Sequence, residues 1–311
     1  MNEFQFIDSL KKIKKNKPIE LAIGDDTAII NLNNGTKQLI CSDTLVENIH
    51  FSFKYFTLYD VIKKTIIVNL SDILAMNGKP LYYLLNLSIP KKLTDKLDQV
   101  SKAISDINKE YNIDLIGGDT TSTKNDTFIS VTMIGETEIP ILRNSAKIND
   151  TIFVGGLPGK SSIALEFLLK DKDTPYKEYH IEPKINFDFL KLFKEFPPNS
   201  LIDISDGLLN DLSHILEDSS NLGAIINNDN FINYDSIFFK YSKNQNLNPF
   251  NFIYNGGEDF IPLFTTSQPE KIKEYAKILN LPLIEVGKII NKEGIFNLKN
   301  ELLNKKGYLH F

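Results

Sequence analysis

Carboxylate side chains follow short apolar runs at six places along the chain, and these are the residues most able to do chemistry. The acids are Asp25 and Asp26, Asp43, Asp72, Asp119, Asp203 and Asp206, and Glu258 and Asp259. If the runs are buried and end at a common edge, the carboxylates lie close together and raise one another's pKa. Such a cluster is tolerable when cations lie within it. Because the candidate ligands are all oxygens, we expect Mg²⁺.

The alternative for each acid is ordinary turn chemistry, because Asp, Gly, Ser and Asn also end strands and cap helices. Asp72 could cap a helix that begins near Ile73. Asp206 could cap the amphipathic helix that reaches Leu216. The repetition of the pattern favours the metal-binding interpretation over six independent turns.

Paired glycines precede two of the acids, at Gly117-Gly118 and Gly256-Gly257. Glycine lets the backbone approach a ligand and present its N–H groups to phosphate oxygens. Metal ions and phosphates together indicate nucleotide chemistry. The segment 155–161 only resembles a phosphate-binding loop, because the spacing GxxxxGK[ST] requires glycine where Val154 stands. We expect a tight strand-to-helix turn there.

The composition is that of a globular protein of about two domains. The chain has 311 residues, of which 42% are hydrophobic and 24% charged, with a formal net charge of −5. Nucleic-acid binding would need clustered positive charge, so we expect no such partner. A single cysteine, Cys41, excludes an intramolecular disulfide. With no secretory signal and no apolar run near the ~18 residues of a membrane span, we expect a cytoplasmic protein.

Two single residues carry weaker signals. Of the 35 basic residues only Arg143 is an arginine, and its planar guanidinium suits bidentate contact with an anion, although one arginine can also persist by chance. His50 follows Asp43 closely, but a lone histidine is more often packed or on the surface. No arrangement of Ser, His and Asp or of Cys and His indicates a nucleophile.

Apolar periodicity alternates between strands and helices along the chain. We expect strands at 39–41, 113–116, 128–134, 151–154, 201–204 and 283–286, and helices at 61–70, 95–111, 161–169, 206–216 and 270–279. The polar segment 136–150 marks a domain boundary, which gives an N-terminal domain (1–138) and a C-terminal domain (139–311). Alternating elements favour an α/β or α+β fold.

Taken together, these motifs resemble the thiamine-monophosphate kinase family, within the ATP-binding superfamily that includes aminoimidazole ribonucleotide synthetase. Seven blocks arrive in family order and span nearly the whole chain. They are 23–28, 42–51, 68–76, 117–121, 202–209, 256–260 and 306–311. Each block alone is modest, but seven in order are highly specific.

The resemblance implies phosphoryl transfer from ATP to thiamine phosphate, giving ADP and thiamine diphosphate, by a direct in-line step. It implies an N-terminal mixed-sheet domain that pairs with its twin in a barrel-like homodimer, followed by an α/β domain. It also implies roles for individual residues. They are Asp26, Ser42, Asp43, Asp72, Asp119, Asp203 and Asp206 for several Mg²⁺ ions; Tyr111, Gly118, Asp119, Arg143 and Ser205 for ATP; His50, Glu258 and Tyr308 for thiamine phosphate; and Asp206, Asp119 and Asp43 as the catalytic group.

The implied chemistry agrees with the residues. Two phosphorylated anions must meet in an acidic site, and Mg²⁺ ions would neutralise them and hold them in line. The acceptor is already an oxygen anion, so little general-base help is needed. Glu258 could face the cationic rings of thiamine, and Arg143 could take phosphate charge.

The chain departs from the family pattern at three places. Cys41 stands where relatives commonly have Ser or Thr, the segment 179–183 lacks the family's arginines, and Lys160 replaces an acid.

Two alternatives to the kinase remain open. The first is a sibling enzyme of the superfamily. One such sibling would show a reactive cysteine in a glycine-rich N-terminal loop, another would end in a cysteine, and a third would lack the blocks around His50 and Glu258. A non-catalytic sensor of nucleotide or thiamine phosphate would lack the metal-binding acids.

Overall fold

The first half of the chain forms a six-stranded mixed sheet in the order β1-β2-β3-β6-β4-β5. The computed structural model describes residues 3–11, 19–32 and 34–305. Its first strands are β1 (Ile19–Leu21), β2 (Ala28–Asn31), β3 (Lys37–Val46), β4 (Lys79–Pro90), β5 (Asp114–Thr123) and β6 (Phe128–Thr137). Neighbours pair antiparallel, except that the edge strand β5 runs parallel to β4.

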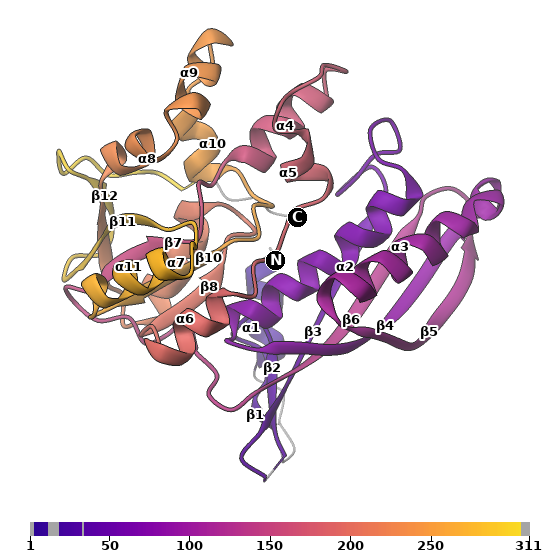
Figure 1. The fold of residues 1–311 in the computed structure, drawn as a ribbon, viewed down its shortest axis with the longest axis horizontal. Helices are drawn as coiled ribbons and strands as arrows, with labels where there is room; N and C mark the ends of the chain where they lie inside the picture. The colour runs from indigo at the N-terminus through magenta and orange to yellow at the C-terminus, as the bar shows by residue number, and fades with distance from the viewer. Residues whose placement is uncertain (1–2, 12–18, 33, 306–311) are drawn as a thin grey trace.

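One face of this sheet is covered by helices (Figure 1). They are α2 (Leu58–Ala75) and α3 (Leu97–Tyr111), with the short 3-10 helix η1 (Lys91–Lys96) before α3 and α1 (Glu3–Lys11) preceding the sheet. Thr57 and Asp60 form a capping box that starts α2. Nearly all of α2 is buried, its polar residues Lys63, Lys64 and Asn69 included, as expected for a helix that packs on more than one side. It lies on β3 and β6 with one face and contacts the second half of the chain with another.

The second half forms another six-stranded sheet in the order β12-β9-β11-β7-β10-β8. Its strands are β7 (Thr151–Val154), β8 (Ser200–Asp203), β9 (Gly223–Ile226), β10 (Pro262–Thr266), β11 (Ile284–Ile290) and β12 (Gly294–Asn297). Its helices are α4 (Lys160–Leu168), α5 (Lys177–Ile181), α6 (Phe189–Glu195), α7 (Leu208–Asp218), α8 (Asn228–Tyr234), α9 (Ser236–Asn244), α10 (Pro249–Asn255) and α11 (Pro269–Ile278). All pairs are antiparallel except β9 with β12.

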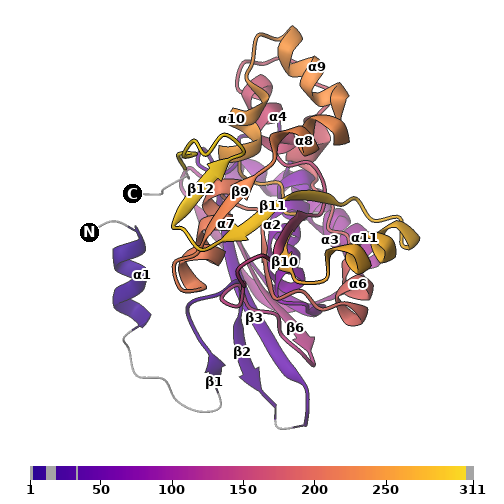
Figure 2. The same ribbon diagram turned by 90° about the vertical axis from the view of Figure 1, so that its left-hand side faces the viewer.

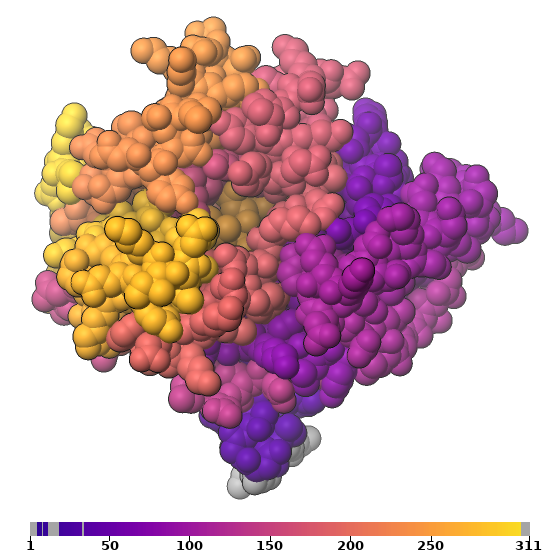
Figure 3. Space-filling view, in the orientation of Figure 1, coloured from indigo at the N-terminus to yellow at the C-terminus, as the bar shows by residue number. Residues whose placement is uncertain are grey.

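The two halves share a hydrophobic core. One continuous buried cluster runs from the first sheet through α2 to α6 and to Phe264 of β10. A second cluster fills the other side of the second sheet, around α7. Figure 2 shows the first sheet below the second, with α2 between them, and the space-filling view shows the halves in direct contact (Figure 3). The position of α2 therefore fixes how the halves meet.

The predicted elements are largely confirmed. The strand over 151–154 has the expected bounds, and the helices expected near 61–70, 161–169 and 270–279 are α2, α4 and α11. The expected strand at 113–116 is the beginning of β5, which continues to Thr123. Helix α7 begins at Leu208 rather than at Asp206. The fold class, a mixed-sheet N-terminal part followed by an α/β part, is also confirmed.

The idea that each acid follows the end of a strand is wrong for three of them. Asp43 and Asp119 lie within β3 and β5, and Asp72 lies within α2, which continues to Ala75 and does not restart at Ile73. The cap of α7 is Gly207, so Asp206 is not a capping residue. Helix α2 carries Asp72 to the site from the side of the sheet, which a pattern of strand ends could not predict.

Within the described residues, no helix is both long enough and apolar enough to cross a bilayer.

Candidate active site

Three carboxylates from different elements meet where α2 packs between β3 and β8. Asp43 comes from β3, Asp72 from the C-terminal end of α2 and Asp203 from the last position of β8. Asp72 and Asp43 share a hydrogen bond, and burial, Asp43 and Asp203 together raise the pKa of Asp72 well above its usual range. Ser71 donates a hydrogen bond to Asp203 Oδ2 at 2.5 Å. The packing of the two halves therefore places carboxylate beside carboxylate.

Asp26 joins these residues from the loop between β1 and β2. Burial, and then the charge of Asp203, raise its pKa well above the usual range. Its Oδ2 is buried and has no hydrogen-bond partner within the described residues. A buried carboxylate oxygen without a donor calls for a proton or a cation. We name Asp26, Asp43, Asp72 and Asp203 the carboxylate cluster.

The carboxylate cluster fits a magnesium ion that arrives with phosphate. No group of three or more His, Cys, Asp or Glu side chains in the described ranges is arranged to hold a metal ion by itself. Mg²⁺, however, is usually bound through one or two carboxylates, and water and substrate phosphates complete its coordination. The raised pKa values and the unpartnered Asp26 oxygen indicate a site with unbalanced negative charge.

A turn before α7 holds Ser205 and Asp206 beside the carboxylate cluster. Asp211 Oδ2 accepts the backbone N–H groups of Ser205, Asp206 and Gly207 at 3.1, 3.1 and 3.0 Å. The charges of Asp206 and Asp203 add to burial in raising the pKa of Asp211. The sequence analysis missed Asp211, because an acid in the first turn of a helix is so common. Its signal was its place five residues after Asp206, within reach of the preceding turn.

Glu258 and His50 line a cavity of about 610 Å³ that also reaches Asp206. Glu258 lies in a turn with φ 62°, and its N–H donates to the Ser205 carbonyl at 2.7 Å. The cavity therefore joins the expected thiamine-phosphate residues to the expected metal-binding acids. A hydrogen bond holds the His50 ring in place, because its Nδ1 accepts the Val46 N–H at 3.1 Å.

The residues expected to contact ATP do not all lie together in the structure. Gly118 and Asp119 lie on the exposed edge strand β5, where Asp119 Oδ1 accepts the N–H of Thr120. No contact between Asp119 and the carboxylate cluster is found in the described part of the chain. Ser42 lies on the sheet face opposite Asp43, because successive side chains of a strand alternate, and its hydroxyl contacts Thr132 at 3.1 Å. Within one chain, then, Ser42 and Asp119 do not join the cluster.

Arg143 lies near the cluster but is already paired. Its guanidinium Nε lies 2.6 Å from Asp218 Oδ2, and its backbone N–H donates to Asp25 Oδ2 at 3.2 Å. Its charge lowers the pKa of Asp26, against the larger effect of burial. The guanidinium thus lies at the edge of the acidic site, where a phosphate would meet positive charge.

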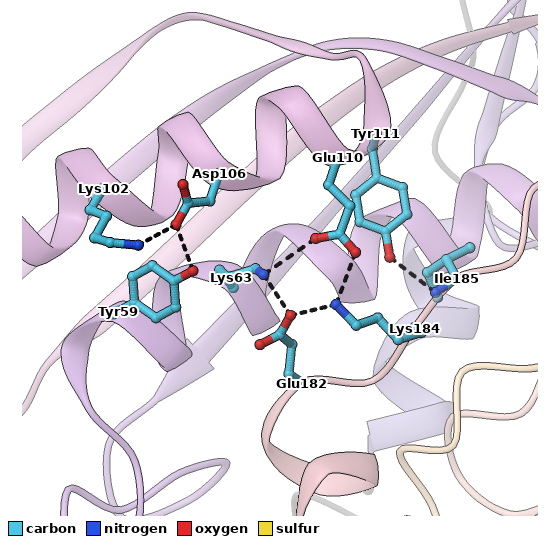
Figure 4. A network of polar contacts seen from close by, with 9 residues as sticks. All are labelled: Tyr59, Lys63, Lys102, Asp106, Glu110, Tyr111, Glu182, Lys184 and Ile185. Carbon is cyan, nitrogen blue, oxygen red and sulfur yellow. Dashed lines mark hydrogen bonds and ion pairs between the residues drawn. The ribbon is translucent and has the colours of Figure 1, made fainter.

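Tyr111 takes part in a polar network between the halves (Figure 4). Lys63 of α2 pairs with Glu110 and with Glu182, at 3.3 and 2.6 Å. Lys184 bridges the same two carboxylates at 2.9 and 2.5 Å. The Tyr111 hydroxyl accepts the Ile185 N–H at 3.2 Å. The segment 179–183 lacks the arginines of the family pattern, and lysines and glutamates fix the segment after α5 to α2 and α3.

The segment that resembles a phosphate-binding loop is a tight turn, as predicted. Gly159 has φ 93° and caps α4. Asp259 accepts the N–H groups of Gly159 and Ser161 at 2.7 and 3.2 Å, so a carboxylate of the chain occupies the helix N-terminus. Lys160 points elsewhere and pairs with Asp235 at 2.7 Å.

Cys41 and Tyr308 are two further residues of interest. Cys41 is buried beside α2, and its thiol lies 3.5 Å from the Asn69 carbonyl; burial, and then the charges of Asp72 and Asp43, raise its pKa well above the usual range. Tyr308 and the rest of block 306–311 lie outside the described residues.

Comparisons with known proteins agree with this geometry. Residues 24–137 match the family model of the AIR synthase related protein, N-terminal domain. The thiamine-monophosphate kinase of Bacillus subtilis is 33% identical over 100% of both chains. That of Buchnera aphidicola from Acyrthosiphon pisum is 34% identical over 99% of this chain and 98% of its own. The solved structure of AaThiL complexed with AMPPCP and TMP matches with TM-score 0.87 and 29% identity, over 100% of this chain and 97% of that one.

The first half of the chain therefore carries a domain that matches the AIR synthase related family, over residues 24–137. The identity shared over the whole length shows that the chain belongs to the thiamine-monophosphate kinase family.

Proposed function

We propose that this protein transfers the γ-phosphoryl group of ATP to thiamine phosphate, giving thiamine diphosphate and ADP in thiamine diphosphate biosynthesis. The observation that carries the proposal is the cavity at Glu258 and His50, which reaches Asp206 beside the carboxylate cluster. An acceptor bound there lies next to the acids that a phosphoryl-transfer site needs. Membership of the family over the whole chain supports the same reaction.

The residues divide into three groups in this proposal. The carboxylate cluster and Asp206 hold Mg²⁺ ions, which neutralise the phosphates of both substrates when bound. Glu258, His50 and Tyr308 hold thiamine phosphate, with Glu258 facing its cationic ring. Tyr111, Gly118, Asp119, Arg143 and Ser205 contact ATP. The acceptor oxygen is already an anion, so the chain positions it in line with the γ-phosphorus and supplies no general base.

We further propose a homodimer, because Ser42, Gly118 and Asp119 do not reach the cluster within one chain. Nine of the ten residues of β5 are exposed, although the strand contains Leu115 and Ile116. A long exposed edge strand is a ready template for pairing with another chain. Pairing through the N-terminal domain (1–138) would add ligands to the acidic site, and the C-terminal domain (139–311) would supply most of the acceptor cavity. We place this reaction in the cytoplasm.

The purified protein tests the proposed function directly. It is incubated with Mg-ATP and thiamine phosphate, and thiamine diphosphate is measured, with free thiamine as acceptor and EDTA as parallel controls. We expect product from the phosphate alone, and only when the metal is present. Binding of both ligands without product would contradict the kinase and favour a sensor. Product that persists in EDTA would contradict the metal-dependent mechanism.

A further inference from the structure

A buried lysine lies directly behind Glu258. Lys64 is 0% exposed in the middle of α2, and its Nζ lies 3.1 Å from Glu258 Oε2. The same ammonium lies 5.2 Å from the centroid of the Phe56 ring. A lysine this deeply buried is costly unless a carboxylate pairs with it. The pair joins the two halves of the chain, because α2 belongs to the first half and Glu258 follows α10 in the second.

His180 supplies the second contact on the same oxygen. Its Nδ1 lies 3.3 Å from Glu258 Oε2 and 3.1 Å from Ser161 Oγ. Burial, and then the charge of Lys64, lower the pKa of His180 to about 3, so the imidazole is neutral at physiological pH. The charge of Glu258 is therefore balanced by Lys64 and not by His180.

The carboxylate held in this way remains accessible to a ligand. The Glu258 side chain is 26% exposed and lines the cavity together with His180 and Ser161. Both contacts are made to Oε2, and Lys64 is not among the residues that line the cavity, whereas His180 is. An anion at this wall matches a positively charged aromatic ring in the cavity.

We propose that Lys64 is a positioning residue for the acceptor substrate: it keeps the Glu258 carboxylate ionised and fixed in orientation, so that Glu258 can attract the cationic ring of thiamine phosphate. This inference rests on the proposed function and deepens it. The electrostatic reason is that burial alone would favour the neutral form of Glu258, whereas the charge of Lys64 holds the pKa of Glu258 below its ordinary value.

The test uses Lys64→Met, which keeps an unbranched side chain one atom shorter and removes its charge. We expect KM for thiamine phosphate to rise by about tenfold to a hundredfold, with kcat and KM for ATP little changed, because a ground-state contact is lost. The matched control is Lys63→Met. Lys63 is the neighbouring lysine of α2 and is 5% exposed, but it pairs with Glu110 and Glu182 rather than with Glu258. This control should leave KM for thiamine phosphate unchanged.

The pH profile separates a charge effect from a structural one. In Lys64→Met the pKa of Glu258 rises, so the ratio of variant to wild-type KM should fall as the pH is raised and the carboxylate ionises. His50, Tyr55, His180 and Asp259 also face or adjoin Glu258 and are present in both proteins, so the ratio of variant to wild-type KM is compared. Lys64→Gln is made in parallel. It keeps a hydrogen-bond donor, so it provides the same test if the methionine variant fails to fold.

Three results would overturn the inference. The first is a KM for thiamine phosphate that is unchanged in Lys64→Gln. The second is an equal rise in Lys63→Met. The third is a full further loss when Lys64→Met is added to Glu258→Gln, since Lys64 should then have nothing left to position. Wild-type turnover tests the proposed function, whereas these ratios test Lys64, so the two failures are distinguishable.

Discussion

Asp206 is the acid that lies both at the cavity and beside the carboxylate cluster. Asp206→Asn keeps the size of the side chain and the contact with Asn210, 3.4 Å away, but removes the charge. We expect turnover to fall by about two orders of magnitude or more, because a metal ligand and its charge are lost. The measurement is kcat with Mg-ATP and thiamine phosphate, with circular dichroism to show an unchanged fold.

Asp188→Asn is the matched control for this variant. Asp188 is 54% exposed, pairs with Lys191 one turn along the chain, and lies in no described cavity. It should retain full activity. Near-normal turnover of Asp206→Asn would show that Asp206 does not hold a metal ion.

Arg143 permits a second test at a single residue. Arg143→Lys keeps the positive charge beside Asp218 but removes the planar guanidinium, whose geometry suits two parallel contacts with a phosphate. We expect KM for ATP to rise by about tenfold, with KM for thiamine phosphate unchanged. Steady-state kinetics with each substrate varied in turn measures both constants, and an unchanged KM for ATP would argue against a phosphate contact.

Single residues were predictable from the sequence when their type was rare or repeated, and not when their role comes from packing. The acids of the cluster were found because the same pattern recurs. Asp211 and Lys64 were missed, because each looks ordinary in its own helix. The role of Asp211 appears only when the turn at Ser205 folds onto the start of α7, and that of Lys64 only when the Glu258 turn, distant in sequence, packs against it.

At the scale of elements, the parallel pair of β4 and β5 depends on one glycine. Gly118 has φ 143°, and a Cβ there would lie 1.8 Å from the Leu85 carbonyl oxygen of β4. Gly118→Ala should therefore lower the free energy of unfolding by more than about 3 kcal/mol, through backbone strain and a clash that no side-chain rotation relieves. Thermal or denaturant unfolding measures the change.

The adjacent glycine provides the control for that strain. A Cβ at Gly117 would meet only the end of the Leu84 side chain, at 3.2 Å, and its φ is not in the left-handed region. Gly117→Ala should cost about 1 kcal/mol or less. Equal losses for the two variants would mean that the close approach of Gly118 to Leu85 does not hold β5 in place.

The type of each element could be predicted from the local sequence pattern, but the way in which the elements pack together could not. The apolar residues around Ile66 predicted a buried helix correctly. The same residues were also interpreted as an apolar run that ends before Asp72, whereas α2 continues past Asp72 to Ala75. Periodicity reports which faces are apolar and cannot report what covers them. Helix α2 is buried nearly all round because it packs between the first sheet and β8, and this packing carries Asp72 to Asp203.

At the scale of the whole molecule, the halves are joined by ion pairs as well as by apolar packing. Lys63 and Lys64 are neighbours on α2, and each contacts a carboxylate of the second half, Glu182 and Glu258 respectively. The first pair belongs to a network that fixes the segment after α5, and the second lies at the cavity. The acceptor site and the interface between the halves are therefore parts of one structure.

The exposed strand β5 leads to a prediction for the assembly. Ile116 is 56% exposed near the beginning of an edge strand that also carries Asp119. Ile116→Glu should dissociate the proposed homodimer, because a charge within an edge strand opposes pairing with a second chain. It should lower kcat as well, if the partner's strand completes the site. Sedimentation equilibrium and turnover measure the two effects on the same sample.

The control is Ile237→Glu on α9, where an isoleucine is 75% exposed in the other half of the chain. It adds the same charge to the surface, away from β5, and should leave both mass and activity unchanged. A wild-type protein that sediments as a monomer and is fully active would contradict the shared site. In that case Ser42 and Asp119 would have no route to the carboxylate cluster, and the four acids that already meet within one chain would have to suffice.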